Sequence, residues 1–387
     1  MAAKKLLFLK KLGKGLLLLI TILAAGALFF SFLAKITRPT FSHVIAYCGL
    51  FFYYILLVNA ALTIVWLILD YRWALIPVLP ILLNVNNIDR HFQLRAQDKP
   101  ETCANCIKVM SYNARVFGVY DANNDVKKRQ ANKRTVMNFF REECPDILCV
   151  QEYFYDKSGK LKFNTTEEVL KALNLPDNER NYRLYLNSST GPHEFGLAVF
   201  SRYRIVNSGL VEMRDSSNNK AMFVDIRYNG DTLRIYNVHL KSMSLGSEDY
   251  ATGKAVLHND MSDPDIEEKT AKLYNKITYA FEQRQYQAIS IRAHIDSCRF
   301  PVIICGDFND SPASYSAHKI GHGFKDSFRS SGQGLGATYF GDAFPSYRID
   351  YIFHDNQYND FGHTICNDIT VSDHRPIYTY ISIINKK

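Results

Sequence analysis

Acidic, amide and imidazole side chains stand at the ends of a series of short apolar segments. The apolar run at residues 302–306 leads directly into Asp307 and Asn309. Gly-Asp and Asn-Asp pairs are also common in ordinary turns, so this run alone decides nothing. Five further runs carry similar residues: 109–112 precedes Asn113, 147–150 precedes Gln151 and Glu152, 235–238 precedes His239, 349–353 contains Asp350, and 369–372 precedes Asp373 and His374. Six such junctions in one chain predict a shared site.

The residue types at these junctions indicate metal-assisted chemistry on an anionic substrate. Carboxylate and carboxamide oxygens are the ligands that Mg²⁺ and Mn²⁺ prefer, and His239 and His374 are suited to proton transfer. Zinc would need more imidazole or thiolate ligands. The sequence contains neither the G-x-S-x-G pattern of serine hydrolases nor a G-x-x-x-x-G-K-[ST] phosphate loop. The pattern favours hydrolysis of a phosphate ester, in which a cation and polar donors neutralise developing charge while an ordered water attacks in line.

Short strands and amphipathic helices must position these residues. Strands are predicted at 107–112, 147–150, 182–186, 196–201, 221–227, 232–239, 302–306, 349–353 and 378–383. Helices are predicted at 126–144, at 165–173 and from about 267, where apolar residues recur at intervals of three and four. So many strands in one block imply two packed sheets with helices outside them. The expected fold class is α/β.

Six sequence motifs resemble, in order, those of the endonuclease/exonuclease/phosphatase superfamily. They are VMSYNARVF, DILCVQEYF, YNVHLKS, ICGDFNDSPAS, YRIDYIF and VSDHRPI, and they extend from about residue 107 to 383. The superfamily includes pancreatic-type deoxyribonucleases, apurinic endonucleases, neutral sphingomyelinases and inositol-polyphosphate 5-phosphatases. The resemblance implies a four-layer α/β/β/α sandwich with a metal site at one edge.

The resemblance also implies which residues hold the metal. Glu152 matches the main Mg²⁺ ligand, and Mn²⁺ is a possible substitute. Asn113 matches a neighbouring ligand or orienting amide, and Asp373 matches a further acidic position near the metal. The expected metal set is therefore Asn113, Glu152 and Asp373.

Five other positions match the catalytic residues of the superfamily. Asp307 and Asn309 match the pair that holds the attacking water or the scissile phosphate. His374 matches the histidine that contacts the phosphate or activates water, and Asp350 matches the carboxylate that orients it. His239 matches a second histidine that protonates the leaving oxygen.

The N-terminal part differs sharply in composition from the rest. Residues 15–34 and 44–69 carry no charge, and each run is long enough to cross a hydrocarbon core of about 30 Å. Residues 73–88 are also uncharged but contain two prolines, and form either a short third span or an interfacial helix. A cleaved signal peptide is the alternative for the first run. The expected organisation is a membrane anchor at 1–88 with transmembrane helices at about 15–35, 44–69 and possibly 73–88, a linker at 89–106 and a catalytic domain at 107–387.

The charges flanking these runs bear on topology. Five lysines precede residue 15 and place the N-terminus in the cytoplasm by the positive-inside rule. Two crossings would return the catalytic domain to the cytoplasm, whereas three would place it outside. We expect three crossings of a plasma or inner membrane, with the domain on the periplasmic or extracellular face.

Net charge and cysteine content limit the function classes. Of the formal +8, the first 14 residues contribute +5 and residues 15–72 contribute +2, which leaves +1 for the rest. A near-neutral domain lacks the basic surface with which proteins grip a nucleic-acid backbone. Cys103 and Cys106 form a lone C-x-x-C without the second pair of a zinc site, so they are a local disulfide or two free thiols.

Three functional hypotheses follow. The first is a membrane-anchored Mg²⁺-dependent hydrolase of phosphate esters, acting on a lipid headgroup, a nucleic acid or a small phosphodiester. The second is a membrane-tethered nuclease on DNA or RNA. The third, a non-catalytic binding module of the same fold, is disfavoured because none of the expected acids, amides or histidines is missing.

Overall fold

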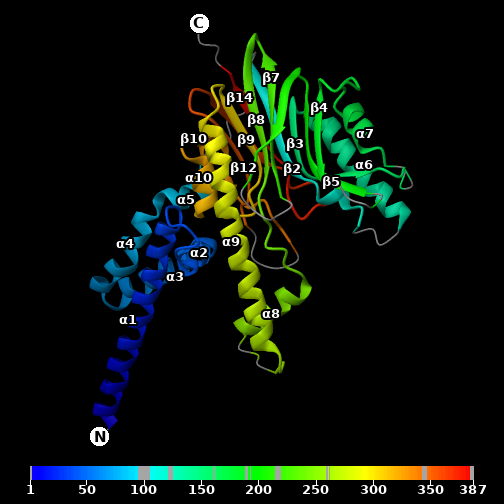
Figure 1. The fold of residues 1–387 in the computed structure, drawn as a ribbon. Coiled ribbons are helices and arrows are strands. Elements are labelled where there is room, and N and C mark those ends of the chain that lie inside the picture. The colour runs from blue at the N-terminus through cyan, green and yellow to red at the C-terminus, as the bar shows by residue number, and fades with distance from the viewer. Residues whose placement is uncertain are drawn as a thin grey trace. The chain divides into compact units, whose positions relative to one another are not determined.

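A computed structural model describes residues 2–94, 105–120, 125–159, 161, 163–187, 191, 193–213, 219–258, 260, 262–341 and 347–383, with side chains from residue 11 onward. The chain forms two compact units. The first, here the helical unit, comprises Met1–His91 and Ser311–Lys319, and the second, here the catalytic unit, comprises Phe92–Asp310 and Ile320–Lys387. The elements of both are labelled in Figure 1.

The helices of the helical unit contact one another through an apolar cluster that includes Leu28, Phe52 and Ala313, and through buried polar side chains. Its elements are α1 (Ala2–Ala34), α2 (His43–Leu50), α3 (Phe52–Leu69), a 3-10 turn η1 (Tyr71–Ala74), α4 (Leu75–Leu83), α5 (Val85–His91) and most of α10 (Tyr315–Gly321). Trp66 Nε1 donates to Thr21 Oγ1 at 2.8 Å, and Asn59 Nδ2 donates to the Ala24 carbonyl at 2.9 Å. These buried polar groups join α3 to α1.

The predicted second span is not one continuous helix. The chain breaks at Phe51, between α2 and α3, where the prediction has an uninterrupted run over 44–69. Near the break the Cys48 carbonyl accepts from Ser31 Oγ at 2.7 Å, and the Gly49 carbonyl accepts from Ser311 Oγ at 3.0 Å. Partners outside the helix therefore satisfy carbonyls that a continuous helix would use itself.

The predicted third span is also interrupted. Residues 73–88 fall on η1, α4 and α5, and none of these has the roughly 20 residues that a membrane crossing needs. Among the described residues, two helices are long and apolar enough to cross a membrane, Lys11–Ala34 and Phe52–Leu69. The shorter apolar stretch Tyr71–Leu83 follows them.

The catalytic unit contains two six-stranded mixed sheets. One has the order β10-β12-β9-β8-β7-β6 and the other β13-β14-β2-β3-β5-β4. In the first sheet the strands are β6 (Ile205–Leu210), β7 (Ala221–Tyr228), β8 (Asp231–His239), β9 (Val302–Asp307), β10 (Phe324–Asp326) and β12 (Asp350–Asp355). In the second they are β2 (Cys106–Asn113), β3 (Ile147–Asp156), β4 (Tyr182–Asn187), β5 (His193–Ser201), β13 (Asn359–Ile365) and β14 (Ile377–Ser382). Only β8–β9 and β2–β3 pair in parallel within these sheets.

The two sheets pack face to face through alternate residues of their strands. Ile107 and Val109 of β2 lie in the same buried cluster as Ile303 and Cys305 of β9, and all four side chains are fully buried. Because side chains alternate along a strand, the intervening residues point to the outer faces. Met110 of β2 accordingly belongs to a second cluster.

Helices cover the outer faces of the sheets. The elements are α6 (Val126–Glu143), α7 (Thr165–Ala172) and the long α9 (Ile266–Asp296). Val136 and Phe140 of α6 and Val169 of α7 join the cluster on the outer face of the second sheet. The buried residues of α9 include Ala288 and Ile291. This arrangement, visible in Figure 1, confirms the predicted α/β sandwich.

The remaining short elements surround the sandwich. They are η2 (Arg115–Gly118), α8 (Ser247–Leu257), α11 (Ser327–Ser331) and a two-stranded pairing of β1 (Phe92–Gln93) with β11 (Gly334–Leu335). Cys106 is disulfide-bonded, and Cys103 lies outside the described residues.

Candidate active site

The alternation of side chains along β2 and β9 brings Asn113 and Asp307 together. Asn113 continues the series of Ile107 and Val109, and Asp307 continues that of Ile303 and Cys305, so both lie on the strand faces that meet between the sheets. Asn113 Nδ2 donates to Asp307 Oδ2 at 2.9 Å, and both side chains are almost fully buried. The centre of the site is thus the polar end of the inter-sheet core.

Strand order in the first sheet adds two more groups at the same edge. His239 ends β8 and is the register partner of Asp307 at the end of the parallel strand β9. Asp350 begins the antiparallel strand β12 and is the partner of Asp307 on the other side. The carboxyl ends of two parallel strands and the start of an antiparallel neighbour share one edge, so this topology gathers all three residues.

Glu152 reaches the site through a backbone distortion. Along β3, strand alternation places Gln151 on the inter-sheet face, where its Nε2 donates to Asn237 Oδ1 at 2.6 Å, and would turn Glu152 away. The pairing of β3 with β5 shifts register between Val150 and Tyr153, and Glu152 has φ +48°. This bulge redirects the side chain, and Glu152 Oε1 accepts from Asn113 Nδ2 at 3.2 Å. Glu152 and Asp307 therefore share one amide donor.

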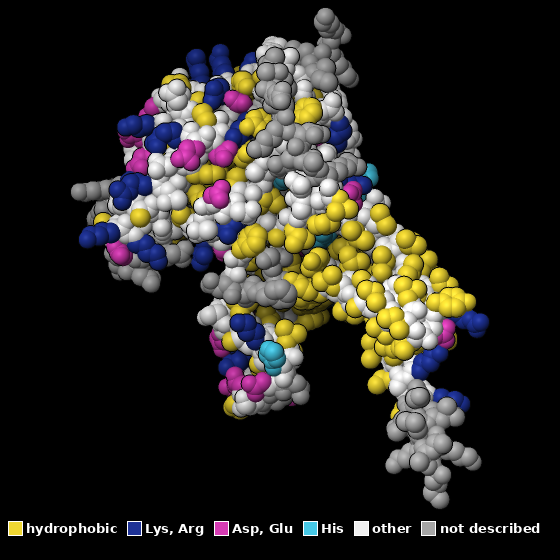
Figure 2. All heavy atoms as spheres, turned by 180° about the vertical axis from the view of Figure 1, so that it is seen from behind, with side chains coloured by type: hydrophobic (Ala, Val, Ile, Leu, Met, Phe, Trp, Pro, Cys, Tyr) yellow, Lys and Arg dark blue, Asp and Glu magenta, His cyan; other side chains and the backbone are white. Residues whose placement is uncertain are grey.

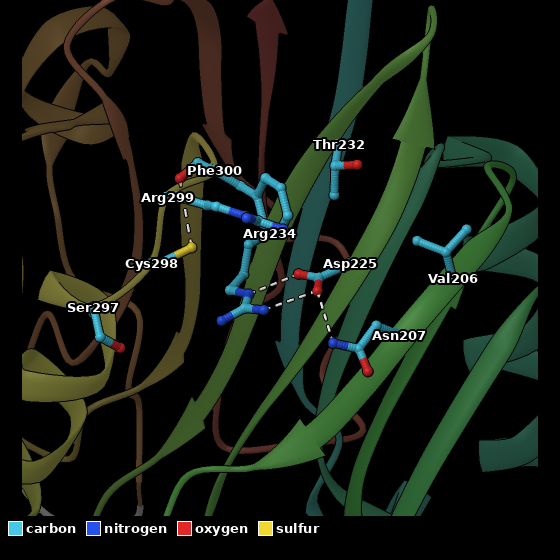
Figure 3. A pocket seen from close by; sticks show the side chains of 9 residues that line it. All are labelled: Val206, Asn207, Asp225, Thr232, Arg234, Ser297, Cys298, Arg299 and Phe300. Carbon is cyan, nitrogen blue, oxygen red and sulfur yellow. Dashed lines mark hydrogen bonds and ion pairs between the residues drawn. The ribbon is translucent and has the colours of Figure 1, made fainter.

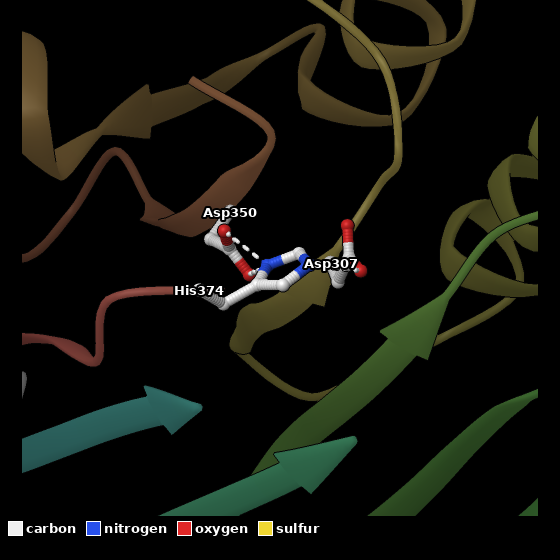
Figure 4. Close-up of side chains that lie close together, drawn as sticks. All are labelled: Asp307, Asp350 and His374. Atoms are coloured by element: carbon white, nitrogen blue, oxygen red, sulfur yellow. Dashed lines mark hydrogen bonds and ion pairs between the residues drawn. The ribbon is translucent and has the colours of Figure 1, made fainter. Parts of the chain in front are cut away.

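His374 forms a buried pair with Asp350. His374 Nδ1 lies 3.0 Å from Asp350 Oδ2, and its Nε2 lies 3.6 Å from Asp307 Oδ2 (Figure 4). Burial alone would lower the pKa of His374, but the carboxylates of Asp350 and Asp307 outweigh burial and raise the pKa to about 10. The pairing at Nδ1 fixes the ring so that Nε2 points toward Asp307.

Asp307 is the most deeply buried acid of the site. Its side chain is 1% exposed, and its Oδ1 accepts from the backbone N–H of Asn309 at 2.8 Å. Burial raises the pKa of Asp307, and the Asp350 carboxylate raises it further, against the opposing effect of the His374 and His239 rings. Asn309 adopts a left-handed φ of +51° and donates from Nδ2 to the Leu240 carbonyl at 3.0 Å. The turn after β9 therefore folds back onto the segment that follows His239.

His239 lies near the carboxylates of Asp307 and Glu152. Its Nε2 lies 3.7 Å from Asp307 Oδ2 and 3.9 Å from Glu152 Oε1, both beyond hydrogen-bond distance. This buried nitrogen has no hydrogen-bond partner within the described structure. An unpartnered buried imidazole nitrogen at an acidic site is available to a substrate atom or a water.

The donor set is suited to a divalent cation. Ligand atoms of Asp307, Asp350 and His374 lie within 4.8 Å of one another. Asp350 binds His374, and Asp307 accepts hydrogen bonds from Asn113 and Asn309. Among the described contacts Glu152 accepts only from Asn113, so its carboxylate is the least committed to protein partners. Three carboxylates gathered in a largely buried place, with the charge of Asp307 disfavoured by burial, match what a hard divalent ion would stabilise.

The structure adds Arg115, which the sequence analysis did not identify. Arg115 Nη1 lies 3.7 Å from Asp373 Oδ2, so the predicted metal-proximal residue Asp373 faces a cation of the protein. Arg115 begins the η2 turn and has φ +41°, and Val116 and Phe117 share this left-handed conformation. Three successive non-glycine residues of this kind are strained and are typical of functional segments. The only sequence signal was the position of Arg115, two residues after Asn113.

A family model described as the Endonuclease/Exonuclease/phosphatase family matches residues 110–374. The chain belongs to this family, whose members are hydrolases of phosphoesters and generally depend on a divalent metal. Residues 14–91 match a separate model, described as a domain of unknown function (DUF8431). No curated protein matches the chain significantly.

The chain is similar in fold to several solved structures, of which three are described. An endonuclease/exonuclease/phosphatase from Beutenbergia cavernae is 16% identical, with 72% of each chain covered and a TM-score of 0.49. The human Nocturnin catalytic domain is 17% identical, with 74% of this chain and 96% of that chain covered and a TM-score of 0.48. Sphingomyelinase C from Streptomyces griseocarneus is 16% identical, with 71% and 99% covered and a TM-score of 0.45. No substrate is carried over from them.

Proposed function

We propose that this chain is a membrane-anchored, Mg²⁺-dependent hydrolase of phosphate esters. The observation that carries the proposal is the placement of two imidazole nitrogens around one carboxylate oxygen. His239 Nε2 and His374 Nε2 lie 3.7 and 3.6 Å from Asp307 Oδ2, one extending from β8 and the other from the segment before β14. A phosphate ester bound there would meet the Asp307 carboxylate and the ring nitrogens of His239 and His374 together.

Each side chain has a role that its contacts support. Asp307 accepts the proton of the attacking water, because its carboxylate stands at the centre of the site. His374 donates to a non-bridging phosphate oxygen, and Asp350 holds the His374 ring in place. Asn309 donates from Nδ2 to Leu240 and Asp307, and one of these hydrogen bonds would pass to the phosphate when substrate binds. His239 protonates the leaving oxygen through its unpartnered Nε2. This assignment places the base and the acid on different residues, as an in-line displacement requires.

Asn113, Glu152 and Asp373 would hold the Mg²⁺ ion, and Asp307, which shares the Asn113 amide with Glu152, lies beside them. Bound there, the ion supplies charge stabilisation for the phosphoryl oxygens and a lower pKa for the attacking water. The protein provides the rest by fixing Glu152 through the bulge in β3 and through the shared amide of Asn113.

The helical unit is proposed to anchor the enzyme in a membrane. Lys11–Ala34 and Phe52–Leu69 have mean hydropathies of 2.6 and 2.2 over their most apolar windows. Their exposed side chains include Leu23 and Ile68, and Figure 2 shows hydrophobic side chains gathered over this unit. Apolar surface of this extent needs a cover, and lipid is the cover that matches two long apolar helices.

A hydrolysis panel on the full-length protein in detergent tests the function. The panel contains bis(p-nitrophenyl) phosphate, p-nitrophenyl phosphate, sphingomyelin, phosphoinositides, plasmid DNA and RNA, each with Mg²⁺ and with EDTA. Metal-dependent cleavage of a phosphate ester supports the proposal, and a preference for nucleic acid would favour the nuclease instead. Activity that survives EDTA would sink the mechanism.

Membrane insertion is tested separately. Retention of the chain in the pellet after an alkaline carbonate wash supports insertion, and release into the supernatant contradicts it. Protease access in sealed vesicles then decides the side of the catalytic unit, which three crossings would place outside and two would return to the side of the N-terminus.

A further inference from the structure

A fully buried arginine on α9 contacts the two segments that carry catalytic residues. Arg284 is 0% exposed, its Nε donates to Asp310 Oδ2 at 3.1 Å, and its Nη1 donates to the Lys241 carbonyl at 2.9 Å. Lys241 lies two residues after His239, and Asp310 directly follows Asn309. One guanidinium thus joins the end of β8 to the end of β9.

Further hydrogen bonds tie these two segments to each other. The Leu240 N–H donates to the Asp307 carbonyl at 3.0 Å, and Asn309 Nδ2 donates to the Leu240 carbonyl. The Asp310 carbonyl accepts from Tyr351 Oη at 2.8 Å. From α9, Gln287 Oε1 also accepts from the Lys241 N–H at 2.9 Å, but among these contacts only Arg284 reaches both segments.

The position of Arg284 is costly for a residue that only fills space. It stands on the apolar face of α9, four residues from both Ala280 and Ala288, which are fully buried. Its Nη2 is buried and has no hydrogen-bond partner within the described structure. A buried ion pair is weak support for stability, because hydrophobic residues of similar volume often stabilise a fold equally well or better. A cost of this kind is expected where geometry matters more than stability.

We propose that Arg284 is a positioning residue that fixes the His239–Lys241 and Asp307–Asp310 segments relative to each other, and so aligns His239 and Asn309 for catalysis. The inference rests on the proposed function for its catalytic consequence, but not for its structural one. Losing the guanidinium lets the two segments separate, and a displacement of about 1 Å at reacting groups costs on the order of 100-fold in rate.

A second buried ion pair in the same unit provides a matched control. Arg234 donates to both oxygens of Asp225, at 2.6 and 2.8 Å, and their side chains are 12% and 3% exposed. The pair lines a cavity of about 390 Å³ (Figure 3). Arg234 stands on β8 five residues before His239, so it belongs to the far end of that strand. Breaking this pair costs stability without contacting the catalytic segments.

The experiment compares Arg284→Met, Arg284→Lys, the double variant Arg284→Met with Asp310→Leu, and Arg234→Met, all in the full-length protein. Three quantities are measured: kcat and KM on bis(p-nitrophenyl) phosphate with Mg²⁺, the thermal midpoint, and hydrogen exchange of peptides covering 239–243 and 305–312. We expect kcat of Arg284→Met to fall about 100-fold with KM changed less than about threefold, and the Leu240 amide to exchange faster. Arg284→Lys recovers part of kcat.

The double variant separates positioning from stability. Its apolar pair recovers the thermal midpoint lost by Arg284→Met, but kcat stays low and the exchange stays fast. Recovery of kcat together with the midpoint would overturn the proposal, as would an equal loss of kcat in Arg234→Met or unchanged exchange in Arg284→Met. If the wild-type protein cleaves no phosphate ester, the proposed function fails, and the exchange data still decide the role of Arg284.

Discussion

The helical unit and the catalytic unit differ in the side chains that they expose. In the helical unit Leu23 and Ile68 are 65% and 79% exposed, while Asn59 is fully buried and donates to a backbone carbonyl. In the catalytic unit Ile303 is fully buried, and Figure 2 shows charged side chains of both signs scattered over the surface. The two units of this chain thus differ in the exposure of their apolar side chains.

Under the membrane insertion proposed above, the two units face different solvents. In water, apolar side chains gather inside and charged ones outside, as in the catalytic unit. Among lipid tails apolar burial brings no gain, so helices associate through small residues and a few polar contacts. On this proposal, the solvent around each unit determines which of its side chains are exposed. Substitutions in the two units test this contrast.

The largest expected effect lies at the polar edge of the catalytic unit. His374→Ala removes the ring that faces Asp307 and leaves Asp350 buried without its partner. We expect kcat/KM on bis(p-nitrophenyl) phosphate to fall about 1,000-fold, the upper range for loss of a positioned donor that stabilises charge in the transition state. The control is His258→Ala, at an exposed position just after α8, which should retain full activity. A loss of less than tenfold in His374→Ala would remove it from the mechanism.

A buried histidine makes the stability of the catalytic unit depend on pH. Burial and the neighbouring Arg348 lower the pKa of His363 from 6.5 to about 4. Between these values the unfolded chain binds more protons than the folded one, so the free energy of unfolding decreases as pH falls. Above pH 6.5 the neutral His363 ring contributes roughly 3 kcal/mol to the free energy of unfolding, and most of this contribution is lost as the pH falls to 4. Chemical denaturation from pH 7 to 4 measures it, and the slope should diminish in His363→Gln.

Glu152→Gln tests whether the bulge in β3 serves metal binding. The variant keeps the shape of the side chain but removes the negative charge beside Asn113. We expect kcat/KM to fall about 100-fold and the Mg²⁺ concentration for half-maximal activity to rise, as for loss of a metal-binding residue. Calorimetric titration with Mn²⁺ gives a readout independent of turnover. Glu179→Gln, at an exposed position, is the control, and unchanged metal affinity in Glu152→Gln would assign the bulge another purpose.

The smallest effect tests close packing in the helical unit. A Cβ at Gly49 would lie 2.6 Å from Ala34 Cβ and 3.3 Å from the Ala313 carbonyl, whereas a Cβ at Gly26 meets nothing within 4 Å. Gly49→Ala should therefore destabilise the unit by about 1–2 kcal/mol through overpacking. Gly26→Ala should stabilise it by about 0.5–1 kcal/mol, because alanine favours the helix. Thermal unfolding in detergent compares the two, and equal effects would mean that these helices do not pack closely at Gly49.

Much of the catalytic fold could be predicted because its signals are local. Apolar runs that end in Asn113, His239 and Asp307 predicted both the strands and the edge at which they meet. The roles of Asn113, Glu152 and Asp373 in metal binding, and those of the catalytic residues, stay predictions. The sequence also held an unused signal for Arg284, a charge on the apolar face of a helix.

The helical unit was predicted less well, because hydropathy reports composition and not continuity. The run 44–69 carries no charge, yet the helix breaks at Phe51, where the carbonyls of Cys48 and Gly49 accept from Ser31 and Ser311. Ser311 lies more than 250 residues further along the chain. No local pattern could indicate that contact.

The sequence by itself determined the order of the strands along the chain, the polar residues at their ends and the membership of a phosphoesterase family, since residue type and period-two spacing are properties of the chain. Only the tertiary structure decided how those residues face one another. Strand alternation alone would turn Glu152 away from the site, and the bulge that brings it back depends on pairing with β5. The contacts of Arg115 with Asp373 and of Arg284 with Asp310 join distant segments, so folding of the whole catalytic unit was needed to create them.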